Sequence, residues 1–327
     1  MLPVCDHYSG VEARMRKSLA LQAEFMQEFG ACVFDVTLDC EDGARVGGER
    51  DQAMMVAALA RGAMAGSSRG GAGCVRRVAV RVHPVRHAAF EMEVQTILSG
   101  AGEDLCHIMV PKVESLADVE FAVEAIDRSR ASRGVADPMP LHVLLESPLA
   151  VHRAFSIASH PRVQSASFGL MDFVSSHGGA IPSDAMSVAG QFVHPMVVRA
   201  KLEVSAACHA HGKVPSHCVV TEFRDLEALQ RSATTAAREF GYTRMWSIHP
   251  GQIRTILAAF APARSEIDVA AQIIVAACKV DWAPIEFSGQ LHDRASYRFF
   301  WHILDRAHQT GQVLPDEVRP YFDSPVH

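Results

Sequence analysis

Short apolar, β-rich runs alternate with longer amphipathic stretches through most of this chain. The amphipathic stretches have the apolar spacing of helices, and they include residues 12–29, 116–129, 192–211 and 225–240. Strands that alternate with helices in this way are typical of a parallel sheet. The apolar runs number eight and cover residues 2–7, 31–38, 77–82, 105–110, 141–145, 163–168, 213–219 and 244–248.

Eight strand–helix units within about 250 residues favour a TIM barrel over an open doubly wound sheet. The part from about Pro262 onward has helical stretches around a polar turn at residues 286–294, outside the eight units. We therefore predict an α/β fold with a (β/α)8 barrel catalytic domain over residues 1–261. Residues 262–327 are expected to form a C-terminal helical appendage or lid.

Composition narrows the class of protein. The chain has 327 residues, of which 49% are hydrophobic and 21% charged, as in a soluble globular protein with a large core. The net charge of -6 and the lack of a basic stripe argue against nucleic acid as a partner. The eight cysteines lack C-x-x-C spacing and indicate reduced thiols in the cytoplasm. We expect no signal peptide, no membrane span and no membrane partner.

Residues 61–73 are rich in Gly and Ser. A loop that cradles phosphate would open a helix, whereas this segment precedes a strand. A flexible connection between a helix and a strand is therefore the favoured interpretation.

Ionisable residues follow the apolar runs at the point where each predicted strand ends. The most concentrated group is the acid triplet Asp39, Glu41 and Asp42, after the second strand. Because TIM-barrel enzymes carry their sites at the C-terminal ends of the strands, these positions are candidate site residues. The other strand ends offer Arg81 and His83, Lys112 and Glu114, Glu146, Asp172, His217 and His249.

Glu146 and Asp172 end neighbouring strands, so together they can hold one hard divalent cation through oxygen. The alternative is that they are solvated loop acids or helix N-caps. For Arg81 the alternative is an ion pair with one of the rim acids. Lys112 and Glu114 can pair with each other across their turn.

Seven motifs follow one another along the chain: LDCEDG at 38–43, VRVHP at 80–84, VPKVES at 110–115, LLES at 144–147, FGLMD at 168–172, TEFRD at 221–225 and WSIHPGQ at 246–252. Together they resemble the citrate lyase beta subunit family, which includes malyl-CoA and citramalyl-CoA lyases and belongs to the wider class of HpcH/HpaI aldolases. The similarity covers nearly the whole chain, in order. The resemblance implies a Mg²⁺-dependent TIM barrel that cleaves or forms a β-hydroxyacyl-CoA, with a 2-oxo acid and an acyl-CoA as the other reactants.

The alternatives within this resemblance are a CoA-independent 2-oxo acid aldolase or a thioesterase on the same scaffold. A non-catalytic subunit of a lyase complex is the alternative from another class. Loss of a metal ligand would favour that subunit, and both carboxylates are present at Glu146 and Asp172.

Carried over residue by residue, the resemblance makes Glu146 and Asp172 the Mg²⁺ ligands, and Arg81 the group that holds the oxo-acid carboxylate. Residues 289–294 resemble the family's lid motif, whose Asp reaches into the site of a neighbouring subunit. Asp293 is then the expected general acid/base, and the protein is expected to be a homo-oligomer, a trimer or a hexamer.

Glu41 and Asp42 join Arg81 and Asp293 as expected catalytic residues, and Lys112 is expected to bind substrate. Where the family usually has Asp-Gly after the seventh strand, this chain has His217-Cys218. An imidazole differs from a carboxylate in charge and in hydrogen bonding. His217 is therefore predicted to line the substrate pocket and to favour a substrate with an additional anionic or hydrogen-bond-accepting group.

Overall fold

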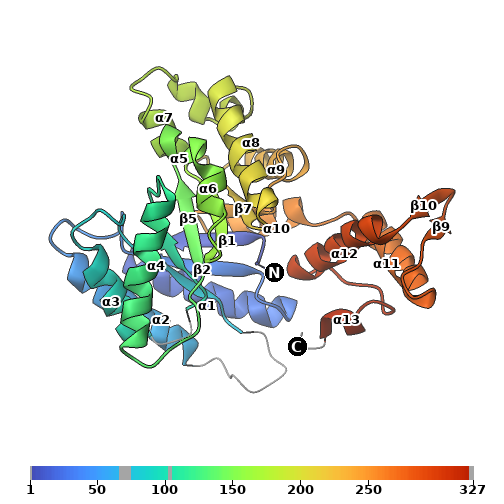
Figure 1. Ribbon diagram of the computed structural model, residues 1–327, viewed down its shortest axis with the longest axis horizontal. Helices are drawn as coiled ribbons and strands as arrows, with labels where there is room; N and C mark the ends of the chain where they lie inside the picture. The colour runs from blue at the N-terminus through green and yellow to red at the C-terminus, as the bar shows by residue number, and fades with distance from the viewer. Residues whose placement is uncertain (1, 66–74, 102–104, 324–327) are drawn as a thin grey trace. The chain divides into compact units, whose positions relative to one another are not determined.

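The computed structural model describes residues 2–65, 75–101 and 105–323 (Figure 1). The chain divides into two compact units, Met1–Ala259 and Phe260–His327. Residues 66–74 of the Gly- and Ser-rich segment lie outside the described residues. The described helices include none that is both long and apolar enough to cross a membrane.

The first unit is a closed barrel of eight parallel strands, each paired with the next in sequence order, and β1 closes the barrel by pairing with β8. The predicted TIM barrel is confirmed. The first strand lies slightly later than the sequence indicated. The strands are β1 (Cys5–Ser9), β2 (Phe34–Asp39), β3 (Val78–Arg81), β4 (Ile108–Val110), β5 (Leu141–Leu145), β6 (Val163–Phe168), β7 (Val214–His217) and β8 (Arg244–Ser247).

Helices connect the strands of the barrel (Figure 1). In the first of them, Met15, Leu19 and Phe25 are buried at helical spacing, and Gly30 ends the helix in the left-handed conformation with φ 65°. The helices are α1 (Glu12–Phe29), α2 (Glu49–Met64), α3 (Phe90–Ala101), α4 (Leu116–Ala131), α5 (Pro148–His152), α6 (Ala154–Ala158), α7 (Leu170–Ser175), α8 (Pro195–Ala210), α9 (Leu226–Arg238) and α10 (Gln252–Phe260), with short 3-10 helices η1 (Ser183–Met186) and η2 (Gly190–Phe192).

Buried charges lie at the N-terminal end of the barrel. The Arg244 guanidinium is fully buried, and its NH2 atom lies 3.0 Å from Asp6 Oδ2 and 2.7 Å from Asp35 Oδ2. Arg77 Nε contacts the other oxygen of Asp35 at 2.6 Å. Two carboxylates and two guanidinium groups thus neutralise one another where many TIM barrels hold branched apolar residues.

This network includes two groups with metal-ligand geometry. The donor atoms of Asp6, His107 and His142 lie within 4.8 Å of one another, as do those of Asp35, Cys106 and His107. The arginines already neutralise both carboxylates, so a divalent cation here would add uncompensated buried charge. We assign the network a structural role.

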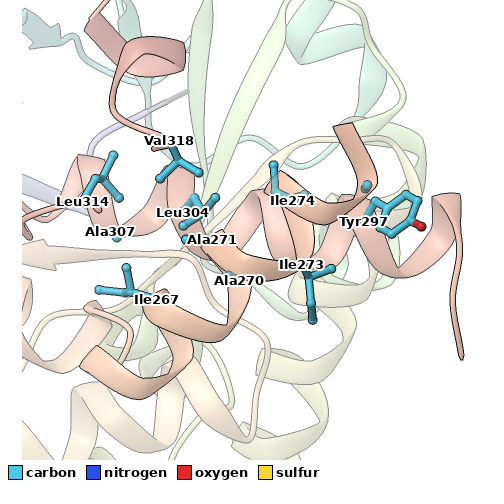
Figure 2. Close-up of a cluster of buried hydrophobic side chains, with 11 residues drawn as sticks. Ile267, Ala270, Ala271, Ile273, Ile274, Tyr297, Leu304, Ala307, Leu314 and Val318 are labelled. Atoms are coloured by element: carbon cyan, nitrogen blue, oxygen red, sulfur yellow. The ribbon is translucent and has the colours of Figure 1, made fainter. Parts of the chain in front are cut away.

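The second unit consists of two long helices, a small hairpin and a short last helix. Its core lies between α11 and α12, where Ile267, Ile274 and Leu304 belong to one cluster of buried hydrophobic side chains (Figure 2). The Tyr297 hydroxyl donates to the carbonyls of Ala283 at 2.7 Å and His292 at 3.1 Å, which ties α12 to the hairpin. The elements are α11 (Arg264–Lys279), β9 (Ile285–Phe287), β10 (Gln290–His292), α12 (Arg294–Gln309) and α13 (Pro320–Asp323).

Candidate active site

Arg81 gathers the acid triplet at the C-terminal rim of the barrel. It is the last residue of β3, next to Asp39 at the end of β2 in the register of the sheet. Its Nε lies 2.7 Å from Asp39 Oδ1, its NH1 lies 2.8 Å from Glu41 Oε2, and its NH2 lies 2.8 Å from Asp42 Oδ2. The rim ion pair considered as an alternative for Arg81 is therefore present, with three carboxylates.

Tyr8, at the end of β1, holds this arginine from a second side. Its hydroxyl donates to Asp39 Oδ2 at 2.5 Å and accepts from Arg81 NH2 at 2.9 Å. The guanidinium carbon lies 4.7 Å from the Tyr8 ring centroid and 6.0 Å from that of Trp246. Burial raises the pKa of the Tyr8 phenol well above its usual value, so it remains a donor. Both aromatic rings fix the orientation of Arg81.

Backbone groups hold the acid loop after β2. Asp39 Oδ1 accepts from the Glu41 N–H at 3.0 Å, and its Oδ2 accepts from the Gly43 N–H at 2.8 Å. A side chain at Gly43 would place a Cβ 2.1 Å from the Gly10 carbonyl oxygen. The loop packs this closely against the end of β1 because residue 43 is glycine.

Lys112 joins this group to Glu146. Its Nζ lies 2.9 Å from Glu41 Oε1, so it pairs with Glu41 and not with Glu114. The backbone of Lys112 is left-handed, with φ 53°, and its N–H donates to Glu146 Oε1 at 2.7 Å. A left-handed backbone at a non-glycine residue is strained, and here it aims a donor at the candidate metal ligand.

Glu146 is a buried carboxylate beside another acid. A Cβ at position 169 would lie 2.4 Å from the Glu146 Cβ, so Gly169 makes room for this side chain. Burial, followed by the charges of Asp172 and Glu41, raises the pKa of Glu146 to about 8. The Lys112 side chain pairs with Glu41, and Glu146 itself has no side-chain cation partner among the described ion pairs. Glu146 and Asp172 therefore fit a hard divalent cation such as Mg²⁺.

His217 lies apart from this group, contrary to the prediction that it lines the substrate pocket. It is fully buried at the end of β7, where its ring stacks on Phe192 at 5.5 Å and meets Tyr242 edge-on at 5.0 Å. Its Nε2 lies 2.6 Å from Lys201 Nζ on α8. Alternate residues of a strand point to opposite faces, and the contact with Lys201 on α8 shows that His217 points toward the surrounding helices.

Lys201 was not expected from the sequence. Its buried ammonium contacts Gln191 Oε1 at 2.5 Å and His217 Nε2 at 2.6 Å, and it lies 4.1 Å from the Phe192 ring centroid. Within the described residues it has no carboxylate partner. Burial lowers the pKa of Lys201 to about 8.

The free energy of unfolding should therefore rise with pH in the wild type relative to Lys201→Met. Between pH 8 and the ordinary lysine pKa of 10.5, the unfolded chain binds a proton that the folded protein has lost, so rising pH stabilises the folded state. We expect a difference of about 1 kcal/mol per pH unit between pH 8 and 9.5. Urea unfolding at several pH values measures it, and parallel pH profiles would refute the assignment.

Asp293 belongs to the second unit and caps α12. Its exposed carboxylate accepts from the N–H groups of Ala295 at 2.9 Å and Ser296 at 3.3 Å. The sequence predicted a catalytic role for this residue. That role remains a prediction.

The fold and this arrangement define a class: (β/α)8-barrel proteins whose C-terminal rim carries a fixed arginine and a buried carboxylate. Residues 19–250 match the sequence model of the HpcH/HpaI aldolase/citrate lyase family. The chain belongs to this family.

Individual relatives agree with the family assignment. A citrate lyase from Burkholderia xenovorans has a crystal structure similar to this one, with a TM-score of 0.81 and 48% identity over 98% of this chain and 97% of that chain. The L-malyl-CoA/beta-methylmalyl-CoA lyase of Cereibacter sphaeroides is 30% identical over 210 residues, which are 61% of this chain and 65% of that protein. The match thus spans slightly less than two thirds of that relative.

A third similarity concerns the fold alone. The protein CitE of Mycobacterium tuberculosis, in complex with magnesium, acetoacetate and coenzyme A, has a TM-score of 0.62 and 21% identity, over 94% of this chain and 98% of that chain.

Proposed function

We propose that this protein is a Mg²⁺-dependent carbon–carbon lyase. It cleaves or forms a β-hydroxyacyl-CoA, such as malyl-CoA or citramalyl-CoA, and the other reactants are a 2-oxo acid and an acyl-CoA. The observation that carries this proposal is the buried Glu146 beside Asp172, on the same rim as a rigidly held Arg81. Family membership supports the same reaction class.

Glu146 and Asp172 would hold the cation. When bound, Mg²⁺ supplies a Lewis acid that polarises the oxygen on the carbon next to the substrate carboxylate. The Lys112 N–H bond to Glu146 Oε1 orients that carboxylate, and Gly169 leaves space for it.

Arg81 would bind the carboxylate of the 2-oxo acid portion. A planar guanidinium can bond a carboxylate through two parallel N–H groups, which an ammonium cannot. Asp39 and Tyr8 hold the guanidinium in place on the side of its Nε and NH2 atoms. Glu41 has one oxygen on Arg81 and the other on Lys112, so we assign it a positioning role.

In the cleavage direction the substrate hydroxyl gives its proton to solvent and becomes the carbonyl oxygen of the 2-oxo acid, while the bond between that carbon and the thioester α-carbon breaks. The electron pair of that bond passes to the thioester as an enolate, and the α-carbon then receives a proton. We assign this last step to Asp293 of a neighbouring subunit, because its carboxylate is exposed and is held by backbone N–H groups alone among the described residues.

Arg81→Lys tests the carboxylate subsite. We expect turnover to fall by about 100-fold or more, because Lys cannot reproduce the planar contacts of Arg81. Initial rates of 2-oxo acid formation from a panel of β-hydroxyacyl-CoA thioesters measure this change, with thermal melting as the check on folding. If the variant keeps full activity, Arg81 serves only the rim ion pairs.

Subunit mixing tests the role of Asp293. Asp293→Asn and Glu146→Gln should each be inactive, and a mixed oligomer should regain activity, because some sites then combine an intact Glu146 with an intact Asp293. Activity is measured after exchange of differently tagged subunits, and co-purification of both tags proves the exchange. An exchanged sample without activity would place both residues in a site formed by one chain.

A further inference from the structure

The three carboxylates on Arg81 differ sharply in exposure. The side chains of Asp39 and Glu41 are 0% and 7% exposed, whereas that of Asp42 is 72% exposed. All three lie within 2.8 Å of a guanidinium nitrogen. The group that would receive a substrate carboxylate is thus already occupied by the protein's own acids.

Two of these acids are held by further contacts. Asp39 also accepts from the Tyr8 hydroxyl and from the backbone N–H groups of Glu41 and Gly43. Glu41 also binds Lys112 Nζ at 2.9 Å. If either carboxylate moved away from Arg81, the other groups that bind it would lose their hydrogen-bond or ion-pair partner.

Asp42 has no such support. Among the described residues, the Asp42 carboxylate is held by Arg81 NH2 alone, at 2.8 Å. The Arg81 side chain is buried, but Asp39 and Glu41 still neutralise it after Asp42 leaves, and water solvates the exposed Asp42 carboxylate. The NH2 atom is shared with the Tyr8 hydroxyl, which also donates to Asp39 and stays in place. Asp42 is therefore the carboxylate that a ligand can replace.

We propose that Asp42 occupies the place of the substrate carboxylate on Arg81 and leaves it when substrate binds. This inference rests on the proposed function of Arg81. Asp42 then acts as an internal competitor that sets the affinity of the carboxylate subsite. It also sets specificity, because a ligand without a carboxylate, such as an acyl-CoA alone, cannot take its place on the guanidinium.

Calorimetric titration with pyruvate, without any thioester, tests the idea apart from catalysis. Asp42→Asn should bind pyruvate about two- to fivefold more tightly than the wild type, because the exposed Asp42 carboxylate then no longer competes for Arg81 NH2. Pyruvamide, which is uncharged, should gain nothing from the substitution. Glu114→Gln, which removes a rim carboxylate that does not contact Arg81, should leave pyruvate affinity unchanged.

Each other outcome counts against the inference. Unchanged or weaker pyruvate binding by a folded Asp42→Asn protein overturns it. Equal tightening by Glu114→Gln overturns it in favour of a general electrostatic effect. If the wild type and Asp42→Asn both fail to bind pyruvate, the carboxylate subsite itself is wrong and the proposed function fails with it. Pyruvate binding that Arg81→Lys leaves unchanged likewise refutes that subsite.

Discussion

Arg244→Met should lower the free energy of unfolding by about 3–5 kcal/mol, since it leaves buried carboxylates without their cation. Asp6 and Asp35 are both fully buried, and Arg244 NH2 contacts both of them. Arg77 can still neutralise Asp35, but it makes no contact with Asp6 among the described ion pairs. Chemical unfolding measures the loss.

The same substitution at a surface arginine is the control. Arg254 pairs with Glu28 at 2.5 Å, and both side chains are about half exposed, at 57% and 47%. Arg254→Met should cost less than about 1 kcal/mol. Adding Asp6→Asn to Arg244→Met should recover part of the loss, because one unpaired charge disappears. Equal effects of the two arginine variants would refute the structural role of the barrel network.

Glu146→Gln should lower turnover by about 1000-fold or more and greatly weaken Mg²⁺ binding, because an amide cannot supply the charge that the cation requires. Calorimetry with Mg²⁺ and initial rates of 2-oxo acid formation measure the two effects. Asp172→Asn should act in the same direction.

Glu114→Gln is the matched control for Glu146→Gln. Glu114 follows β4 on the same rim. Lys112 forms its ion pair with Glu41 and not with Glu114, so Glu114 is outside the network that reaches Glu146. This variant should keep its Mg²⁺ affinity and its activity. Unchanged Mg²⁺ affinity in both Glu146→Gln and Asp172→Asn would refute the metal site.

The barrel was predictable because its strands and helices follow from local apolar patterns. All eight strands formed near the expected residues. The rim location of Arg81, Glu146 and Asp172 then followed from the general placement of TIM-barrel sites. The partners of these residues did not follow, because the contact of Arg81 with Tyr8 joins side chains 73 positions apart in sequence.

From the sequence alone, the three carboxylates of the acid triplet could not be distinguished by burial. Burial separates them: Asp39 is a fixed anchor and Asp42 is exposed. That difference depends on how the loop after β2 packs against Gly10, which no local pattern encodes.

The error at His217 has a simple cause. β7 is only four residues long and reads Val-Pro-Ser-His, so no apolar alternation shows which side chains face the pocket. A signal for its true partner existed: Lys201 lies at helical spacing between Val197 and Val204 on the buried face of α8. A lysine among buried apolar positions predicts an unusual internal contact.

The most direct test of the account is product analysis with malyl-CoA and citramalyl-CoA, with and without Mg²⁺. A Mg²⁺-dependent lyase should produce 2-oxo acid and a shorter acyl-CoA in equal amounts, without accumulating free CoA thiol, and EDTA should abolish the reaction. Free CoA together with an intact hydroxy acid would show a thioesterase. Failure to release any 2-oxo acid from either thioester in the presence of Mg²⁺ would contradict the proposed lyase.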